Sequence, residues 1–281
     1  MKTQHAVLSA LTALMLLASC SSGDDYVPVL SLKTPNAEGG ATVQQIKYAG
    51  AFTTVYRWTF SYNAGGQLTL AKAWKLTDGI TEVQDDQAAT YQLNYEPTRI
   101  SVTTGGQAAP VQLDVADGLL ASASSGNTVY RYAYSADRRL ISWDVTYQNS
   151  GFNATTTKGA AALVTWTADG DIATIVYTPS MDAPAKHYTY SYTYSDARNV
   201  NGLLPELSSR ALGCEGSEYM FYSGMLGKAT THLPTRLDIV YSEMPDEVQT
   251  YQFRYSPTNG SAVTRLEYGD LGHVVNVEYN Y

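Results

Sequence analysis

The sequence lacks the residue patterns on which metal sites and nucleophilic enzymes are built. It has two cysteines and four histidines, which form no HxH, HExxH or CxxC arrangement. It also has no GxSxG nucleophile motif and no GxxxxGKS/T phosphate loop. His187, His232 and His273 are scattered, and the sequence places no base beside Cys214. We therefore expect no metal, no cofactor and no catalytic residue, and we interpret Cys214 as a small buried side chain.

Charge is also scarce, and its balance is wrong for a nucleic-acid partner. Charged residues make up 16% of the chain, against about 25% in an average domain, and the net charge is −8. Proteins that bind nucleic acid carry a basic surface, which this composition does not supply. Beyond the amino-terminal segment no apolar run approaches the length of about 20 residues that a membrane-spanning helix needs.

The amino-terminal segment is typical of a secretory signal. A short start with one lysine is followed by an apolar run over residues 6–18, which is too short to span a bilayer. The run ends in Leu17-Ala18-Ser19-Cys20, which resembles the lipobox of bacterial lipoproteins. The resemblance implies that the Cys20 thiol is acylated and that the peptide is cut just before it. The alternative is an ordinary signal peptide with a chance cysteine. With Cys20 acylated, Cys214 has no partner for an intrachain disulfide.

The residues after Cys20 have the composition of a flexible tether. Ser21-Ser22-Gly23-Asp24-Asp25 contains no apolar side chain that could pack. It resembles the acidic signal that sends Bacteroidota lipoproteins to the outer face of the outer membrane, with a plain linker as the alternative. We expect a signal peptide over residues 1–19, a lipidated tether over 20–40 and one antiparallel β domain over 41–281.

Tyrosine is heavily over-used, and it recurs with period two. The chain has 23 Tyr against 5 Phe and 4 Trp. In residues 188–194 four Tyr alternate with Thr and Ser, which predicts a strand with one aromatic face. We expect this face to be largely buried, although an aromatic surface that stacks on sugars or peptides is the alternative. Similar strands are expected over residues 56–62, 130–134 and 251–255.

These strands belong to a degenerate hairpin repeat. A polar five-residue spacer follows the last aromatic residue, and an apolar residue then begins the return strand. The spacers contain Gly, Asp or Asn, which hairpin turns require. The copies run from Tyr62 to Leu68, from Tyr134 to Leu140, from Trp166 to Ile172 and from Tyr194 to Val200, with a looser copy from Tyr251 to Val263.

Residues 201–234 break the alternation. The stretch from Tyr219 to Lys228 is apolar without period two, and we expect a short helix or buried loop there. The simplest interpretation is that the insert closes one end of the core. We predict that Phe221, Met225 and Leu226 pack against the aromatic faces and fill the interior. A filled interior leaves little room for a ligand, so binding would fall on hairpin loops or the outer face.

Together these motifs resemble a known family. The Tyr hairpins resemble YD repeats. With the lipobox, the segment Gly224-Met225-Leu226-Gly227-Lys228 and the following Leu233-Pro234, the mature chain resembles Bacteroidota lipoproteins of unknown function with a porin-like fold. In that family the segment reads Gly-Leu-Leu-Gly-Lys, so Met225 replaces the first Leu. The resemblance implies a curved or barrel-like antiparallel sheet and no activity.

Two alternatives to a binding module follow from the residues. Asp85-Asp86 or Asp169 with Asp171 could supply the carboxylate pair of a glycoside hydrolase, although Asp is also expected in turns. An integral outer-membrane barrel would fit the last strand, which is apolar at alternate positions and ends on Tyr281. Against it, Tyr and Thr dominate where Leu, Val and Ile would face lipid.

The sequence therefore predicts an all-β, single-domain meander, curved or closed into a barrel and tethered by Cys20. We expect an envelope lipoprotein of the outer membrane that faces the cell exterior. Its predicted role is that of a non-catalytic binding or structural module, with a glycan or a protein as ligand and the membrane as partner through the lipid anchor. An integral outer-membrane barrel and a hydrolase with an unrecognised site are the alternatives.

Overall fold

A computed structural model describes residues 41–49, 55–75, 83–96, 100–106, 108–149, 155–257, 262–270 and 273–281. Cys20, the expected signal peptide and the expected tether lie outside the described residues.

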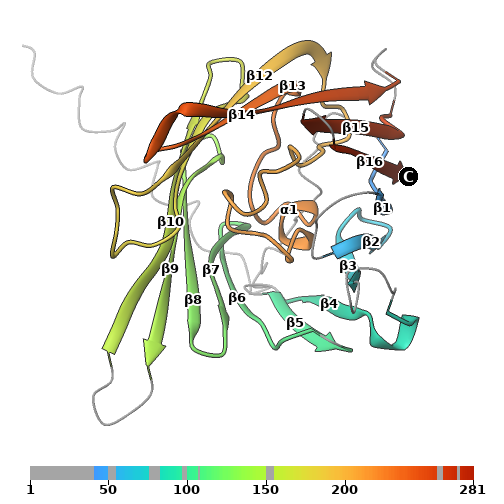
Figure 1. The fold of residues 1–281 in the computed structure, drawn as a ribbon. Coiled ribbons are helices and arrows are strands. Elements are labelled where there is room, and N and C mark those ends of the chain that lie inside the picture. The colour runs from blue at the N-terminus through green and yellow to red at the C-terminus, as the bar shows by residue number, and fades with distance from the viewer. Residues whose placement is uncertain are drawn as a thin grey trace, which may run out of the picture.

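The chain forms a closed antiparallel barrel of 16 strands in which every strand pairs with its neighbours in sequence, and β1 pairs with β16 to close it (Figure 1). The strands are β1 (Gln45–Ala49), β2 (Val55–Tyr62), β3 (Leu68–Lys75), β4 (Ala89–Tyr95), β5 (Ile100–Gly105), β6 (Gln112–Ala116), β7 (Leu119–Ser125), β8 (Thr128–Tyr134), β9 (Leu140–Asn149), β10 (Thr155–Trp166), β11 (Ile172–Thr178), β12 (Tyr188–Arg198), β13 (His232–Tyr241), β14 (Met244–Ser256), β15 (Arg265–Asp270) and β16 (His273–Asn280). The expectation of a curved or closed meander is confirmed.

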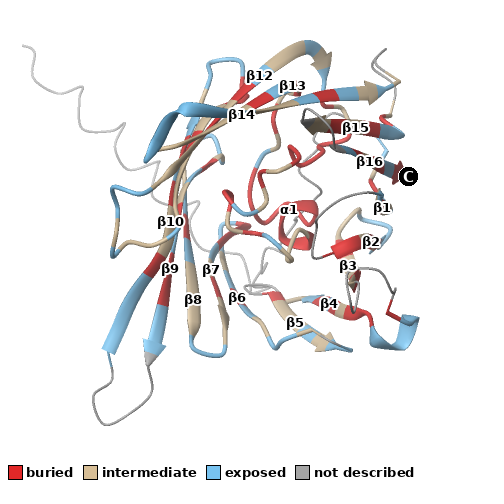
Figure 2. Cartoon of the chain, in the orientation of Figure 1, coloured by how far each residue is buried: buried red, intermediate tan, exposed pale blue. Residues whose placement is uncertain are grey.

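The period-two pattern sets which side of each strand faces the interior. In β12 the side chains of Tyr190 and Tyr192 are buried, each 8% exposed, while Tyr188 and Tyr194 on the same face are half-buried. Successive side chains of a strand point to opposite faces, so the Thr and Ser residues between these Tyr face outward. Buried residues recur along the strands of the wall, and they gather in the segment that lies inside it (Figure 2).

Three of the predicted hairpin turns share one hydrogen-bond pattern. In each, the first spacer residue donates its N–H to the carbonyl of the fifth, and the fourth donates to the carbonyl of the first. The fourth residue has a positive φ, 79° at Gly66, 69° at Arg138 and 93° at Gly170. The common spacer therefore encodes one turn, which glycine adopts without strain and Arg138 adopts at a cost.

The fourth predicted hairpin is not a hairpin. β12 continues past Tyr194 to Arg198, and the chain then enters the barrel instead of turning back to a strand at Val200. The absence of glycine does not explain the difference, because the spacer of the Tyr134 copy also has none and still turns. Here the Asn199 side chain bonds Leu203 and Thr230 of the following segment instead.

Residues 199–231, here called the plug, lie inside the barrel (Figure 1). The plug contains one helical turn, α1 (Tyr219–Tyr222), and all four of its residues are buried. In the described part of the connection between β3 and β4 lies a 3-10 turn, η1 (Asp85–Gln87). No helix in the described ranges has the length and apolarity that crossing a membrane requires.

Candidate functional site

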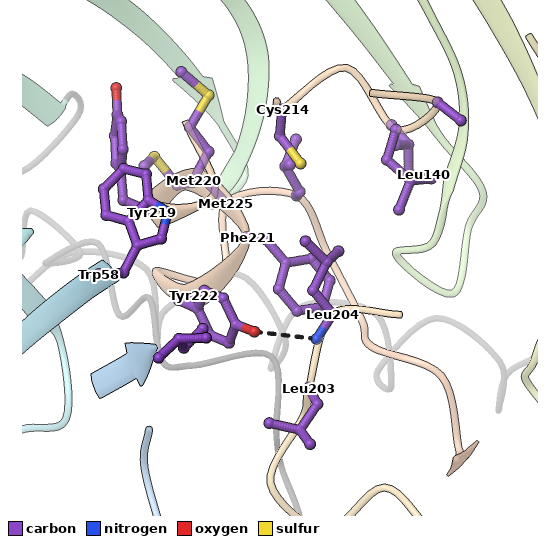
Figure 3. Close-up of a cluster of buried hydrophobic side chains, with 14 of the residues drawn as sticks. Trp58, Leu140, Leu203, Leu204, Cys214, Tyr219, Met220, Phe221, Tyr222 and Met225 are labelled. Carbon is purple, nitrogen blue, oxygen red and sulfur yellow. Dashed lines mark hydrogen bonds between the residues drawn. The ribbon is translucent and has the colours of Figure 1, made fainter. Parts of the chain in front are cut away.

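The plug is the apolar centre of the molecule. Phe221, Met225 and Leu226 are at most 4% exposed, which confirms the prediction that they pack in the interior. Around α1, Tyr219 stacks on Tyr91 of β4 with ring centroids 4.4 Å apart, and Tyr222 lies 4.9 Å from Phe60 of β2. Figure 3 shows Trp58 of the wall beside Tyr219, and the hydroxyl of Tyr222 bonded within the plug to the amide of Leu204.

Polar groups of the wall hold the plug backbone. Tyr132 donates its hydroxyl hydrogen to the Gly213 carbonyl at 2.8 Å, and the Trp143 indole donates to the Ala211 carbonyl at 2.8 Å. Tyr134 donates to the Met225 carbonyl at 3.2 Å. A loop buried inside a barrel exposes carbonyls that no neighbouring strand satisfies, and a hydroxyl on an aromatic ring reaches them. This role accounts for the hydroxyl groups of Tyr132 and Tyr134 on the inner face.

The plug also approaches the wall closely at two glycines. A Cβ on Gly213 would lie 2.7 Å from the Trp143 ring, and one on Gly227 would lie 2.4 Å from the Arg138 carbonyl oxygen. Lys228 donates its N–H to that same carbonyl at 3.1 Å. The plug is therefore seated on the wall by shape as well as by hydrogen bonds.

The two ends of the plug are tied together at a neck. The Asn199 side chain accepts from the Leu203 N–H at 2.8 Å and donates to the Leu203 carbonyl and to the Thr230 hydroxyl. The Asp171 carboxylate lies 2.7 Å from Nδ1 of His232 and accepts from the His232 N–H at 2.8 Å. These bonds fix where the chain leaves β12 and where it enters β13.

The plug does not fill the whole interior. A cavity of about 230 Å³ remains between it and the wall. The aromatic side chains that line it are Tyr48, Trp58, Tyr190 and Tyr268, and the polar side chains are Glu206, Ser209, Arg210, Glu215 and Glu218. This space is below the range of about 300–1,000 Å³ typical of ligand pockets, in keeping with the expectation that a plugged interior leaves little room for a ligand.

Glu206 is a buried carboxyl group in this cavity. It is 8% exposed, and its Oε1 accepts a hydrogen bond from the Tyr279 hydroxyl at 3.1 Å. Burial raises the pKa of Glu206 to about 8, partly opposed by this hydrogen bond. The group therefore holds a proton near neutral pH.

Glu218 is the second carboxyl group. Its Oε1 accepts from the Gly216 N–H at 3.1 Å, whereas Oε2 is buried and has no hydrogen-bond partner among the described residues. Burial raises the pKa of Glu218 to about 7. Sequence reasoning missed both groups. The available signal was the presence of glutamates inside an apolar insert, because charged residues are seldom buried unless they have a partner.

The residues that the sequence offered as catalytic candidates do not form a site. Asp85 and Asp86 lie exposed in η1, and Asp85 accepts from the Trp74 indole at 2.9 Å. Asp171 is buried in its bonds to His232, while Asp169 is exposed. No group of three or more His, Cys, Asp or Glu that could hold a metal occurs within the described ranges.

Cys214 is a buried free thiol in the plug, as interpreted from the sequence. Burial raises its pKa well above the usual value, which is the opposite of what a nucleophilic cysteine needs.

The outer face of the barrel carries charge in the middle of its strands. Arg131 lies opposite Asp144 across β8 and β9, and Arg254 lies opposite Glu267 across β14 and β15. Their closest nitrogen and oxygen atoms are 3.9 and 3.5 Å apart. Arg236 bonds Asp238 on the same face of β13 at 2.8 Å. The lipid-facing band of a membrane barrel is apolar instead, and an Arg or Lys at its midplane costs about 2–4 kcal/mol.

Two solved structures resemble this chain. A porin-like protein from Bacteroides uniformis is 14% identical, with a TM-score of 0.63, and the alignment covers 86% of this chain and 98% of that one. A porin-like protein from Bacteroides vulgatus is 11% identical, with a TM-score of 0.55, covering 85% of this chain and 98% of that one. No protein-family model and no curated protein matches the chain.

At this level of identity the likeness establishes the fold, a porin-like barrel.

Proposed function

We propose that this chain is an outer-membrane lipoprotein whose plugged barrel lies in the aqueous phase outside the bilayer. In this proposal the barrel serves as a non-catalytic binding module. The observation that carries the proposal is the distribution of aromatic and charged side chains between the inner and outer faces of the barrel wall. Its aromatic face points inward onto a seated plug, and its outer face carries ion pairs such as that between Arg131 and Asp144. An acyl chain on Cys20 would then supply the membrane attachment, and the barrel would not conduct.

The test distinguishes a barrel that is attached to the membrane by an acyl chain from a barrel that is embedded in the bilayer. Wild-type protein and a Cys20→Ala variant are expressed in a Bacteroidota host, and the outer membrane is washed with alkaline carbonate. We expect the wild type to stay in the membrane fraction and Cys20→Ala to be released as a folded, detergent-free barrel. Cys214→Ala is the matched control, because it removes the other cysteine and should leave the fractionation unchanged.

An integral outer-membrane barrel is the second candidate, favoured by the likeness to porin-like proteins. It predicts the reverse result, in which Cys20→Ala stays in carbonate-washed membranes and needs detergent for extraction. Conductance steps in a planar bilayer would also support it.

The orientation and the absence of catalysis are separate parts of the proposal. Surface exposure predicts that a protease added to intact cells digests the protein. A binding module should bind on a glycan or peptide array without turnover of what it binds, and turnover would favour a hydrolase.

A further inference from the structure

The cavity between plug and wall combines features that the proposed function does not use. It has aromatic walls from four different strands, and the plug contributes the buried Glu206 and the half-buried Glu218. Arg210 and Glu215, both exposed, lie at its edge and bond each other through two hydrogen bonds of 2.8 and 3.0 Å. The guanidinium at the edge is thus already neutralised by its neighbour.

The carboxylate of Glu218 has an unused acceptor. Its Oε1 accepts from Gly216, and its buried Oε2 makes no hydrogen bond of normal geometry with the described residues, although the Ser209 hydroxyl lies close enough to the carboxyl to lower its pKa. A buried acceptor without a donor destabilises the folded state, so proteins seldom keep one. A ligand that brings an N–H into the cavity would supply the missing donor.

The charges of the side chains that line the cavity determine the sign of the charge that a ligand should carry. Three carboxyl groups and one guanidinium line the cavity, so the ionised site has an excess of negative charge. Such a lining repels an anion and attracts a cation. Trp58 and three Tyr are among the lining residues, and aromatic rings attract ammonium groups in desolvated sites.

From these features we propose that the cavity binds a small organic ammonium ion. The volume of about 230 Å³ is below the range of about 300–1,000 Å³ typical of drug-sized ligands, so a short amine fits and a polymer does not. The inference rests on the proposed function in that it names a ligand class for the binding module. The fractionation experiment above does not depend on it, so the two can fail separately.

Binding and protonation are linked at this site. The two carboxyl groups hold protons near neutral pH in the empty cavity, and their loss would leave the anionic form that a cation prefers. Amine binding should therefore release protons and become stronger as pH rises from about 5.5 to about 8. A ligand held only by apolar contact would show neither effect.

The test is calorimetric titration of the wild-type barrel with n-butylammonium chloride, with 1-butanol as the uncharged analogue. We expect saturable binding of the amine, no binding of the alcohol, and proton release when two buffers of different ionisation enthalpy are compared. Glu218→Gln should weaken binding about tenfold or more. Glu247→Gln removes the same charge from an exposed position of β14 and should leave the affinity unchanged.

Three results would overturn the inference. These are an absence of saturable heat up to about 10 mM amine, equal binding of the alcohol, and equal losses from Glu218→Gln and Glu247→Gln. Near-ultraviolet circular dichroism of each variant shows whether the plug is still packed. If Glu218→Gln does not fold, two measurements on the wild type still test whether the cavity binds an ammonium ion. These are the comparison of amine with alcohol and the proton release.

Discussion

At the residue scale, the recurring feature is an aromatic side chain on the inner face of the wall that donates a hydrogen bond. Tyr132 and Trp143 lie on adjacent strands and both bond to carbonyls of the plug. Other inward Tyr, such as Tyr62 and Tyr95, donate to carbonyls of the wall or the chain beside it. The alternation in the sequence predicted the inward faces. It could not predict the partners, because these lie up to 91 residues away in sequence.

The first prediction concerns the Tyr132 hydroxyl. Tyr132→Phe keeps the ring but leaves the Gly213 carbonyl without its donor, so the free energy of unfolding should fall by about 1–3 kcal/mol. Tyr130→Phe is the control on the same strand and face. The Tyr130 hydroxyl bonds none of the described residues, and its loss should cost at most about 0.5 kcal/mol. Urea unfolding measures both, and equal losses would contradict the role given to Tyr132.

The second prediction concerns the contact of Gly213 with Trp143. Gly213 and Gly216 have nearly equal positive φ values of 70° and 72°, so alanine should cost each about 1 kcal/mol in backbone strain. Only Gly213 has a ring where the new Cβ would go, and overpacking should add about 1–3 kcal/mol. Comparing the melting temperatures of Gly213→Ala and Gly216→Ala separates the cost of overpacking from the cost of backbone strain. A Gly213→Ala melting temperature no lower than that of Gly216→Ala would mean that the plug moves away at no cost.

At the element scale, the hairpins were predictable because their signal is local. The turns after Tyr62, Tyr134 and Trp166 depend on the spacer alone, and all three form as expected. The hairpin predicted after Tyr194 does not form, because the conformation there depends on Asn199, whose side chain bonds residues four and 31 positions away in the chain.

The apolar stretch around α1 was recognisable as buried, but its position inside the barrel depends on closure between β1 and β16. That closure joins the two ends of the described chain and has no local signal.

The third prediction is that the neck keeps the plug inaccessible. Chymotrypsin cuts after aromatic residues, and Tyr219, Phe221 and Tyr222 are all buried in the wild type, so cleavage between Ala211 and Lys228 should be slow. Asn199→Ala removes three bonds at the neck and should speed this cleavage. Asn94→Ala, on the exposed side of β4, should not. Rapid cleavage of the wild type in this segment would mean that the plug is a mobile lid.

At the scale of the whole molecule, the barrel places acidic groups in its interior. Glu206 and Glu218 are held by the plug, and Tyr279 of β16 bonds one of them from the wall. In the unfolded chain a glutamate loses its proton near pH 4.5, whereas burial raises the pKa to about 8 for Glu206 and about 7 for Glu218. Between these values the folded protein binds more protons than the unfolded chain. Its stability from these two groups is therefore full below pH 4.5 and is lost as pH rises through the folded pKa values.

The last prediction follows from that sign. The free energy of unfolding of the wild type should fall as pH is raised from about 5 to about 9, the reverse of a protein stabilised by salt-bridged carboxylates. Glu206→Gln replaces the buried carboxyl with an amide that cannot ionise and can still accept from the Tyr279 hydroxyl, so it should flatten this fall. Glu247→Gln, exposed on β14, is the charge-matched control and should leave the slope as it is. Urea unfolding at a series of pH values gives the slopes directly. A wild-type stability independent of pH over this range would show that the interior carboxyl groups are hydrated and ionised, with water in the cavity solvating them as well as bulk solvent would.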